Sequence, residues 1–178
     1  MSYQKGLIMK LFSFCLLLAL SFEVNADTFN LPEAGVSFDA PNEFTALSQR
    51  EIALKFPGQY PPAYAVGNLH RSTSIAYDLK SDPMMPEDLP ETMGFFGEFF
   101  DKYIPGIEWK ERKIINMRGQ DWIYMEMSSK ALNADIHNIM LVTSRYGKVL
   151  MFNFNATNFD FSIMEPELRK SIDSIVLN

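Results

Sequence analysis

Hydrophobic and polar residues alternate along several stretches of the chain, and this period of two predicts strands with one buried face. The first stretch covers residues 35–41, and residues 43–47 are expected to form a short second strand. The clearest alternation lies within residues 65–80, where one face should be buried and the other exposed or lightly covered. The two faces are Thr73, Ile75, Tyr77 and Leu79, and Ser74, Ala76, Asp78 and Lys80.

The second half of the chain holds a run of predicted strands joined by short turns. The strands cover residues 107–117, 122–129, 133–143 and 149–156. Strands joined by tight turns pair as antiparallel neighbours. In the strand at 122–129, Trp122, Tyr124 and Glu126 share one face.

Two segments carry apolar residues at helical spacing. The first helix is expected over residues 89–104, with Asp88 as its N-cap and Glu91 completing a capping box. Its apolar stripe consists of Met93, Phe96, Phe99, Phe100 and Tyr103. The second helix closes the chain and is expected to start at Glu165, although a Ser162 cap competes with that start.

This order of elements predicts an α+β fold, in which an antiparallel β-sheet is flanked by helices on one face or on both. Each helix has one apolar stripe, and that stripe must be buried against the sheet. The length fits a single domain, and 47% hydrophobic residues suffice for a core.

The amino terminus has the pattern of a cleavable export signal. Lys5 and Lys10 precede an apolar run over residues 11–22, and Val24-Asn25-Ala26 resembles a cleavage site. The apolar run is about twelve residues, whereas a membrane-spanning helix needs roughly twenty. Residues 1–26 are therefore predicted to be a signal peptide and residues 27–178 the exported domain, with Met9 as an alternative start. Since the only cysteine, Cys15, lies in the signal, disulfides are excluded from the exported domain.

The charge balance narrows the classes of partner. Of the 16 basic and 22 acidic residues, the signal holds Lys5, Lys10 and Glu23, which leaves 14 basic and 21 acidic residues and a net charge of −7. Nucleic acid and anionic lipid headgroups both need a basic face. Neither is expected as a partner, and no membrane anchor should remain after signal cleavage.

Residue types that carry chemistry are sparse. His70 and His137 are far apart and belong to no metal-binding spacing, so both are expected to be partly exposed strand residues. No G-x-S-x-G turn is present, and Ser128-Ser129-Lys130 is not an S-x-x-K motif. The loop at 82–91 is acidic but lacks the glycine spacing of an EF-hand. The sequence predicts no enzyme activity, no metal and no cofactor.

Methionine and phenylalanine are abundant, with eleven and fifteen residues. They can fill the space between helix and sheet, or form an adaptable apolar surface. Tyr60 and Tyr64 also flank prolines in a predicted loop, and tyrosine is favoured at interfaces. The candidate interaction surface consists of Tyr60, Tyr64, Met84, Met85 and Phe95.

The arrangement resembles the PsbP-like fold, which is shared by the extrinsic photosystem subunit, the Ran-binding Mog protein of yeast and exported DcrB-like proteins of bacteria. The features that carry the resemblance are the opening Gly35-Val36-Ser37-Phe38-Asp39-Ala40-Pro41, the helix at 89–104, the hairpins around Arg118-Gly119-Gln120 and Tyr146-Gly147-Lys148, and the terminal helix. The resemblance implies an α/β/α sandwich that serves as a binding or assembly accessory, without a shared catalytic motif.

These observations favour a non-catalytic, periplasmic or secreted protein that binds another protein. An immunity-type inhibitor of a secreted toxin is one version, because an acidic surface suits a basic target. The alternative is a carrier or sensor of a small apolar ligand in a pocket between helix and sheet.

Overall fold

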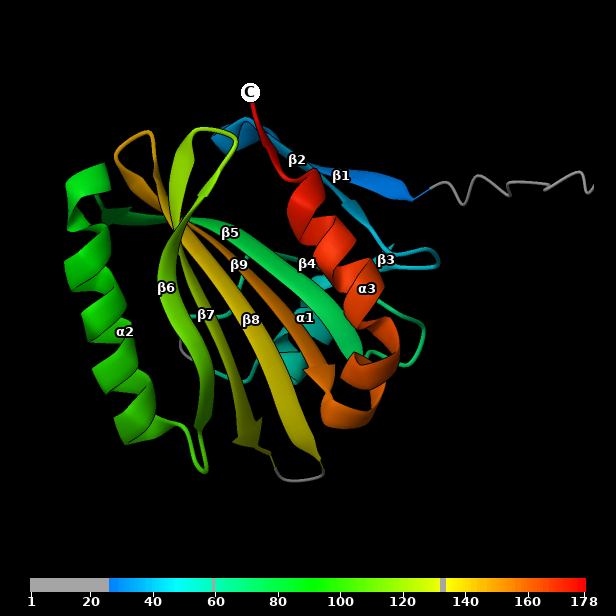
Figure 1. Ribbon diagram of the computed structural model, residues 1–178. Coiled ribbons are helices and arrows are strands. Elements are labelled where there is room, and N and C mark those ends of the chain that lie inside the picture. The colour runs from blue at the N-terminus through cyan, green and yellow to red at the C-terminus, as the bar shows by residue number, and fades with distance from the viewer. Residues whose placement is uncertain (1–25, 59, 132–133) are drawn as a thin grey trace, which may run out of the picture.

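The computed structural model describes residues 26–58, 60–131 and 134–178 (Figure 1). Apart from Ala26, the predicted signal peptide lies outside the described residues. Leu132 and Asn133 lie outside them as well. No helix among the described residues is long and apolar enough to cross a membrane.

Seven strands form the main sheet in the order β3-β4-β5-β9-β8-β7-β6, and each neighbouring pair is antiparallel. Their bounds are Thr45–Ala46 (β3), Tyr64–Gly67 (β4), Thr73–Pro83 (β5), Glu108–Met117 (β6), Gln120–Lys130 (β7), Asp135–Arg145 (β8) and Lys148–Thr157 (β9). The edge strand β6 contains a bulge, because Lys110 is an additional residue between Trp109 and Glu111. A smaller sheet pairs β2 (Val36–Ala40) with β1 (Asp27–Leu31) and β10 (Val176–Leu177).

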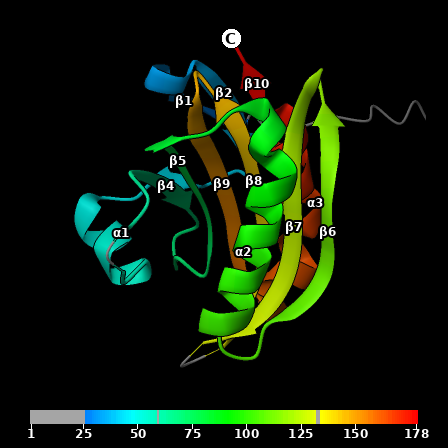
Figure 2. The ribbon, with the colours of Figure 1, turned by 90° about the vertical axis from the view of Figure 1, so that its left-hand side faces the viewer.

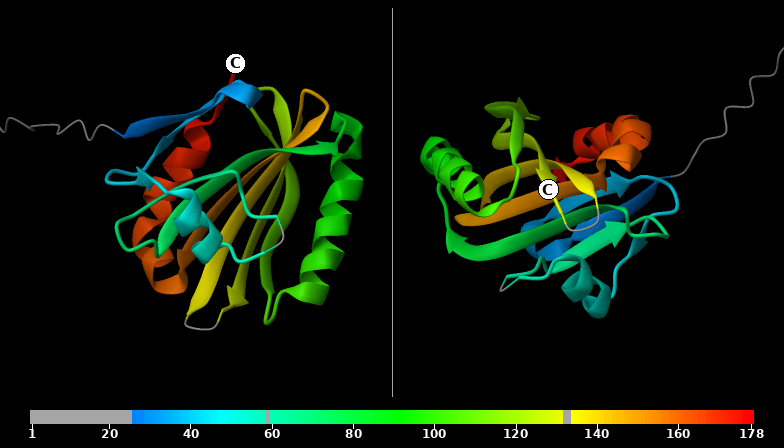
Figure 3. Two further views of the ribbon diagram at one scale, coloured as in Figure 1. Left: turned by 180° about the vertical axis from the view of Figure 1, so that it is seen from behind. Right: turned by 90° about the horizontal axis from the view of Figure 1, so that it is seen from below.

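In the described part of the chain, three α-helices pack on the main sheet, and two short 3₁₀ helices occur in the connections between β1 and β2 and between β5 and α2. Their bounds are Gln49–Lys55 (α1), Leu89–Tyr103 (α2), Asn158–Ser174 (α3), Pro32–Ala34 (η1) and Pro86–Asp88 (η2). The α2 and α3 helices cover opposite faces (Figure 2), and α1 lies on the face away from α3, near β4 and β5 (Figure 3). The predicted α+β sandwich with helices on both faces is therefore confirmed.

The alternating pattern of the strands divides the core into two main clusters. Trp122, Tyr124 and Phe152 face α3 and the small sheet, where they join buried residues of β2 such as Phe38. Residues of the opposite parity, including Met125, face α2. A third, smaller cluster forms around Ile52 beneath α1. The sheet is thus covered on both faces, as the resemblance implied.

The strand β5 differs from its prediction, since both of its faces are buried in its first half. One of the two faces was expected to be exposed or lightly covered, yet residues of both faces are buried: Thr73, Ile75 and Tyr77 on one, and Ser74, Ala76 and Asp78 on the other. Helix α1, which was not predicted, covers Ala76, and the segment before β4 lies against Asp78, whose carboxylate accepts a hydrogen bond from the Ala63 amide at 3.1 Å. Ile52 of α1 packs with Ala65 and Ala76, and the helix begins in a capping box between Ser48 and Glu51.

Both predicted helices exist, and α2 begins at Leu89 as predicted, but its cap and the start of the terminal helix differ from the prediction. The carboxylate of Asp88 accepts a hydrogen bond from the Met85 amide at 2.7 Å, at the start of η2. It makes no side-chain hydrogen bond to the first turn of α2, so the predicted cap of α2 is wrong. The terminal helix begins at Asn158 instead of Glu165. The Thr157 hydroxyl caps it by accepting a hydrogen bond from the Asp160 amide at 3.1 Å. Pro166 consequently lies inside α3. The strands β1 and β10 were also not predicted.

Candidate functional site

The helix α2 carries two rows of aromatic side chains with different surroundings. Phe96 and Phe100 are half-buried and pack on the core cluster beneath the helix. Phe95, Phe99 and Tyr103 are spaced four residues apart and form an outer row, named here the aromatic row. Because residues i and i+4 lie above one another on a helix, the three rings follow one line along its surface.

The rings of the aromatic row contact one another and remain open to solvent. The ring centroids of Phe95 and Phe99 are 6.0 Å apart, and those of Phe99 and Tyr103 are 4.8 Å apart. Phe95 is 61% exposed, Phe99 43% and Tyr103 59%. Single exposed apolar residues are ordinary, whereas a continuous apolar surface indicates an interaction site.

The helix beneath this row is firmly held by β6. Phe100 stacks on Trp109 with ring centroids 6.3 Å apart, and the Trp109 indole N–H donates to the Asp101 carboxylate at 2.7 Å. The Arg112 guanidinium lies over the Trp109 ring and passes close to Gly97, where any side chain would meet it. The aromatic row therefore stands on a fixed element.

Acidic residues outnumber basic residues on the exposed surface of α2, and they lie along one side of the aromatic row. The exposed ones on or just before the helix are Glu87, Glu91, Glu98 and Asp101. The basic residue of the helix, Lys102, lies over the Tyr103 ring at 5.0 Å. An apolar row with acidic neighbours suits a partner that combines apolar and basic groups.

The structure separates the five residues of the predicted interaction surface. Phe95 belongs to the aromatic row, and Met85 is exposed just before η2. Met84 is only 2% exposed and packs beneath α2, so its placement on a surface is wrong. Its position is set by its backbone, since the Ser144 hydroxyl donates to the Met84 carbonyl at 2.6 Å.

The two tyrosines of the predicted surface do not form one patch with α2. Tyr60 is exposed and borders a pocket next to β5 and β9. Tyr64 stacks on Tyr77 with ring centroids 5.6 Å apart, and Tyr77 belongs to the core cluster on the α3 side. Tyr64 is thus partly a structural residue.

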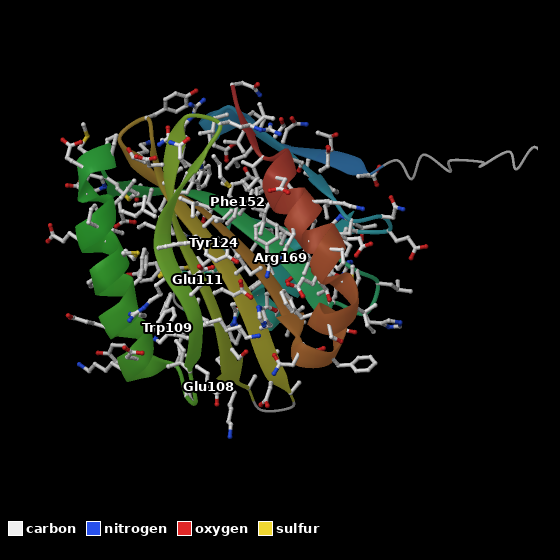
Figure 4. All side chains as sticks on the ribbon, viewed as in Figure 1. Glu108, Trp109, Glu111, Tyr124, Phe152 and Arg169 are labelled. Atoms are coloured by element: carbon white, nitrogen blue, oxygen red, sulfur yellow. The ribbon has the colours of Figure 1, made fainter. Side chains whose placement is uncertain are left out.

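A partly buried polar cluster lies between the sheet and α3, and Figure 4 labels two of its members, Tyr124 and Arg169. The Tyr124 hydroxyl donates to Glu126, and His137 Nε2 lies 2.9 Å from Glu126 Oε1. Arg169 of α3 joins them, with its Nη1 3.1 Å from the Tyr124 hydroxyl and its Nη2 3.3 Å from Glu126 Oε2. Arg169 also pairs with Glu165 at 2.7 Å.

Both histidines were predicted to be partly exposed strand residues, and neither is. His137 is on β8 but only 2% exposed, and its ring stacks on Phe161 of α3 with centroids 3.4 Å apart. His70 is exposed but lies in the turn between β4 and β5. Because one histidine is enclosed and the other is in a separate turn, they do not form a joint site.

The electrostatics of the cluster fix its protonation. Burial of Glu126 disfavours its charged form and raises the pKa of its carboxyl. Hydrogen bonds from Tyr124 and His137 and the positive charge of Arg169 outweigh this effect, so the pKa of Glu126 is lowered overall. Burial and Lys110 lower the pKa of His137 against the effect of Glu126. Burial also raises the pKa of Tyr124 to about 12. The neutral imidazole therefore donates its Nε2–H to a carboxylate, which can only accept.

The contacts of Arg169 and Phe161 with this cluster join α3 to the sheet. Within the described ranges, no serine or threonine hydroxyl hydrogen-bonds to His137, and Phe161 covers the ring. No three histidine, cysteine, aspartate or glutamate side chains converge as metal ligands in that same part of the chain. The signal for the cluster was present in the sequence, because Glu126 shares a strand face with Trp122 and Tyr124.

Comparison with known proteins finds similarity in structure alone. No protein-family model matches the chain, and no curated protein matches it in sequence. Solved structures do match over most of the chain. The solution structure of the cyanobacterial PsbP protein, CyanoP, from Synechocystis sp. PCC 6803 matches with a TM-score of 0.63 and 14% identity, covering 87% of this chain and 94% of that one.

Two further structures come from other bacteria. A Pseudomonas aeruginosa protein of unknown function, described as a putative regulator, matches with a TM-score of 0.52 and 16% identity over 86% of this chain and 98% of that one. LpqN of Mycobacterium tuberculosis, described as involved in cell envelope biogenesis, matches with a TM-score of 0.51 and 13% identity over 88% of this chain and 87% of that one. The resemblance inferred from the sequence is confirmed: this chain has the PsbP-like fold.

Proposed function

We propose that this protein is an exported, non-catalytic accessory protein that binds another protein through the aromatic row of α2. The observation that carries the proposal is the exposed line of Phe95, Phe99 and Tyr103 on a helix that β6 holds in place. Aromatic side chains dominate the binding energy of protein interfaces when a partner covers them. A rigid row also loses little conformational entropy on binding.

The acidic surroundings support a partner with basic groups near an apolar groove. Glu91 and Glu98 lie beside Phe95 on the exposed surface of α2. Complementary charge would raise the association rate and exclude acidic partners. An immunity-type inhibitor of a secreted basic toxin is one form of this function.

Export is supported by the signal pattern at residues 1–26. One protein of the same fold, LpqN, is described as involved in cell envelope biogenesis, which is compatible with an accessory role in the envelope. A non-catalytic role is supported by the enclosed state of His137 beneath Phe161. Fold alone does not determine function, so the aromatic row remains the main support.

The proposal can be tested by site-specific photocrosslinking in the native cell. A photoreactive phenylalanine analogue replaces Phe95 or Phe99 in the full chain, and adducts are identified by mass spectrometry. The matched control is Phe159 of α3, which is 74% exposed and lies outside the aromatic row. We expect one protein adduct from positions 95 and 99 and none of it from position 159. Equal adducts from all three positions, or none from positions 95 and 99, would refute the proposal.

A further inference from the structure

A pocket lies where the hairpin of β6 and β7 meets the end of α3 and the strand β10 (Figure 1). Its volume is about 410 Å³, and its apolar lining residues are Met117, Ile175, Val176 and Leu177. Pockets that hold small molecules have volumes of about 300–1,000 Å³, so this one is large enough for a ligand. It contains no residue of α2 and is therefore independent of the aromatic row.

The charge of this pocket is opposite to that of the protein. Residues 27–178 contain 14 basic and 21 acidic residues, a net charge of −7. The charged residues that line the pocket are two arginines, Arg118 and Arg145, and no acidic residue in the described part of the chain joins them there. A molecule that enters this pocket therefore meets apolar groups and positive charge together.

Arg145 is already held by contacts within the protein. Its Nε donates to the Ala34 carbonyl at 2.7 Å, and its Nη2 donates to the Tyr146 hydroxyl at 2.8 Å and to the backbone oxygen of Asn178. The guanidinium also lies over the Tyr146 ring at 4.2 Å. Arg145 therefore fixes one wall of the pocket, and its contribution to a ligand is mainly positive charge.

Arg118 keeps most of its hydrogen-bond donors for a ligand. Its Nη2 donates to the Asp173 carbonyl at 2.7 Å, which orients the side chain. Its Nε and Nη1 make no hydrogen bond to any described residue, and no carboxylate among those residues forms an ion pair with it. A guanidinium has five N–H groups in a planar fork that matches the two oxygens of a carboxylate. One such cation suits a ligand with a single negative charge.

A buried tryptophan supplies a further donor. Trp122 is only 1% exposed and lines the pocket. Its indole N–H makes no hydrogen bond within residues 26–58, 60–131 and 134–178, whereas the N–H of Trp109 donates to Asp101. The fully enclosed side-chain atoms without a partner in those ranges belong to Thr73, Ser74 and Asn153, so the Trp122 N–H is not sealed off. An acceptor in the pocket would satisfy it, because an indole N–H can only donate.

We propose that this pocket binds a small monocarboxylate with an apolar body, whose carboxylate accepts hydrogen bonds from Arg118 and from the Trp122 indole N–H. The apolar body would lie against Met117, Ile175 and Leu177. Hydrogen bonds between charged groups are roughly twice as strong as neutral ones. The pocket would therefore select acids over alcohols of equal length.

The test follows the two indole N–H signals of the ¹⁵N-labelled protein, purified after expression of the full chain, during titration with octanoate. The chain has two tryptophans, and Trp109 packs beside α2, so its signal is an internal control. We expect octanoate to shift the Trp122 signal saturably and to leave the Trp109 signal in place. Octanol and acetate should each bind at least about tenfold more weakly, because one lacks the charge and the other the apolar body.

Three outcomes of this titration would overturn the proposal. Equal affinity for octanol would show that the charge is not recognised, and equal affinity for acetate would indicate a simple anion site. Shifts of both indole signals alike, or of neither, would show that octanoate does not bind in this pocket.

A variant and a matched control assign the binding to Arg118. Arg118→Asn removes the guanidinium but suits the turn, because Arg118 and Gly119 both have positive φ and Asn-Gly is a preferred pair there. The variant should fold and lose the preference for octanoate over octanol. Arg50→Asn removes the same charge from an exposed position of α1 and should keep the preference. A preference that persists in Arg118→Asn would refute the assignment.

Discussion

His137 Nε2 lies 2.9 Å from Glu126 Oε1 across the paired strands β7 and β8, and both side chains are buried. Burial lowers the pKa of His137 in the folded protein, whereas the unfolded chain protonates this residue near pH 6.5. Below that pH the unfolded state binds more protons than the folded state, so acid favours unfolding. We predict that the His137 contribution to stability is complete above about pH 6.5 and is lost as pH falls through the lower pKa of the folded state.

Urea denaturation at pH 7.5 and pH 5.5 measures this effect. His137→Gln retains an N–H donor for Glu126 but cannot titrate, so its free energy of unfolding should fall less between the two pH values than that of the wild type. His70→Gln is the matched control, because it makes the same replacement at the other histidine, which is exposed in a turn. The same loss in wild type and His137→Gln would contradict the prediction. A further loss below about pH 4.5 is expected from Glu126, whose folded pKa is also lowered.

The two aromatic rows of α2 should differ sharply in their contribution to stability. Phe100→Ala removes a ring that packs on Trp109 and the core, and should cost about 2–3 kcal/mol of the free energy of unfolding. Phe95→Ala should change it by less than about 0.5 kcal/mol, because the ring is mostly exposed. Chemical denaturation checks both values. A large loss for Phe95→Ala would show that this ring is part of the core.

Two glycines of α2 provide a matched pair. Alanine is favoured over glycine in a helix by about 1 kcal/mol. Gly94 has open space where a side chain would lie, so Gly94→Ala should stabilise the protein by about 0.5–1 kcal/mol. A side chain at Gly97 would instead meet the Arg112 guanidinium and displace it from Trp109. Thermal melting should therefore show a gain for Gly94→Ala and a smaller gain or a loss for Gly97→Ala.

The observed start of α3 can be tested against the predicted one. The Thr157 hydroxyl accepts the Asp160 amide at 3.1 Å, so Thr157→Ala should cost about 1 kcal/mol. The competing cap predicted from the sequence was Ser162, whose hydroxyl instead donates to the Phe159 carbonyl within the helix. Ser162→Ala should have little effect in the same denaturation experiment. The reverse ranking would restore the later helix start.

The sequence predicted the hairpin strands well, because their alternation is an intrinsic property of each strand. The predicted strand at 122–129 lies within β7, and the one at 149–156 lies within β9. The helix α1 was missed although Ser48 and Glu51 are readable as a capping box. A seven-residue helix with one buried residue, Ile52, carries too few apolar positions to show a period.

The candidate sites could be predicted only in part. An apolar stripe was visible on α2, but the sequence could not show that Phe96 faces the core while Phe99 faces solvent. Met84 was placed on the surface because nothing local indicates that the Ser144 hydroxyl bonds its carbonyl. The contact of His137 with Glu126 depends on the pairing register of β7 and β8, and on α3 starting early enough to bring Phe161 over the imidazole. Each of these contacts joins residues that are distant in the chain.

The edge strand β6 has a consequence for how the molecule behaves at high concentration. The strand β6 is ten residues long, and alternate residues turn their backbone groups to the open side, where they could pair with a strand of another molecule. Most of its side chains are exposed, several of them carry charge, and the bulge at Lys110 interrupts the regular spacing. Charge and a bulge hinder a second strand from aligning there. This edge therefore hinders fibril growth in a sheet-rich protein whose residues 27–178 contain no cysteine for a disulfide.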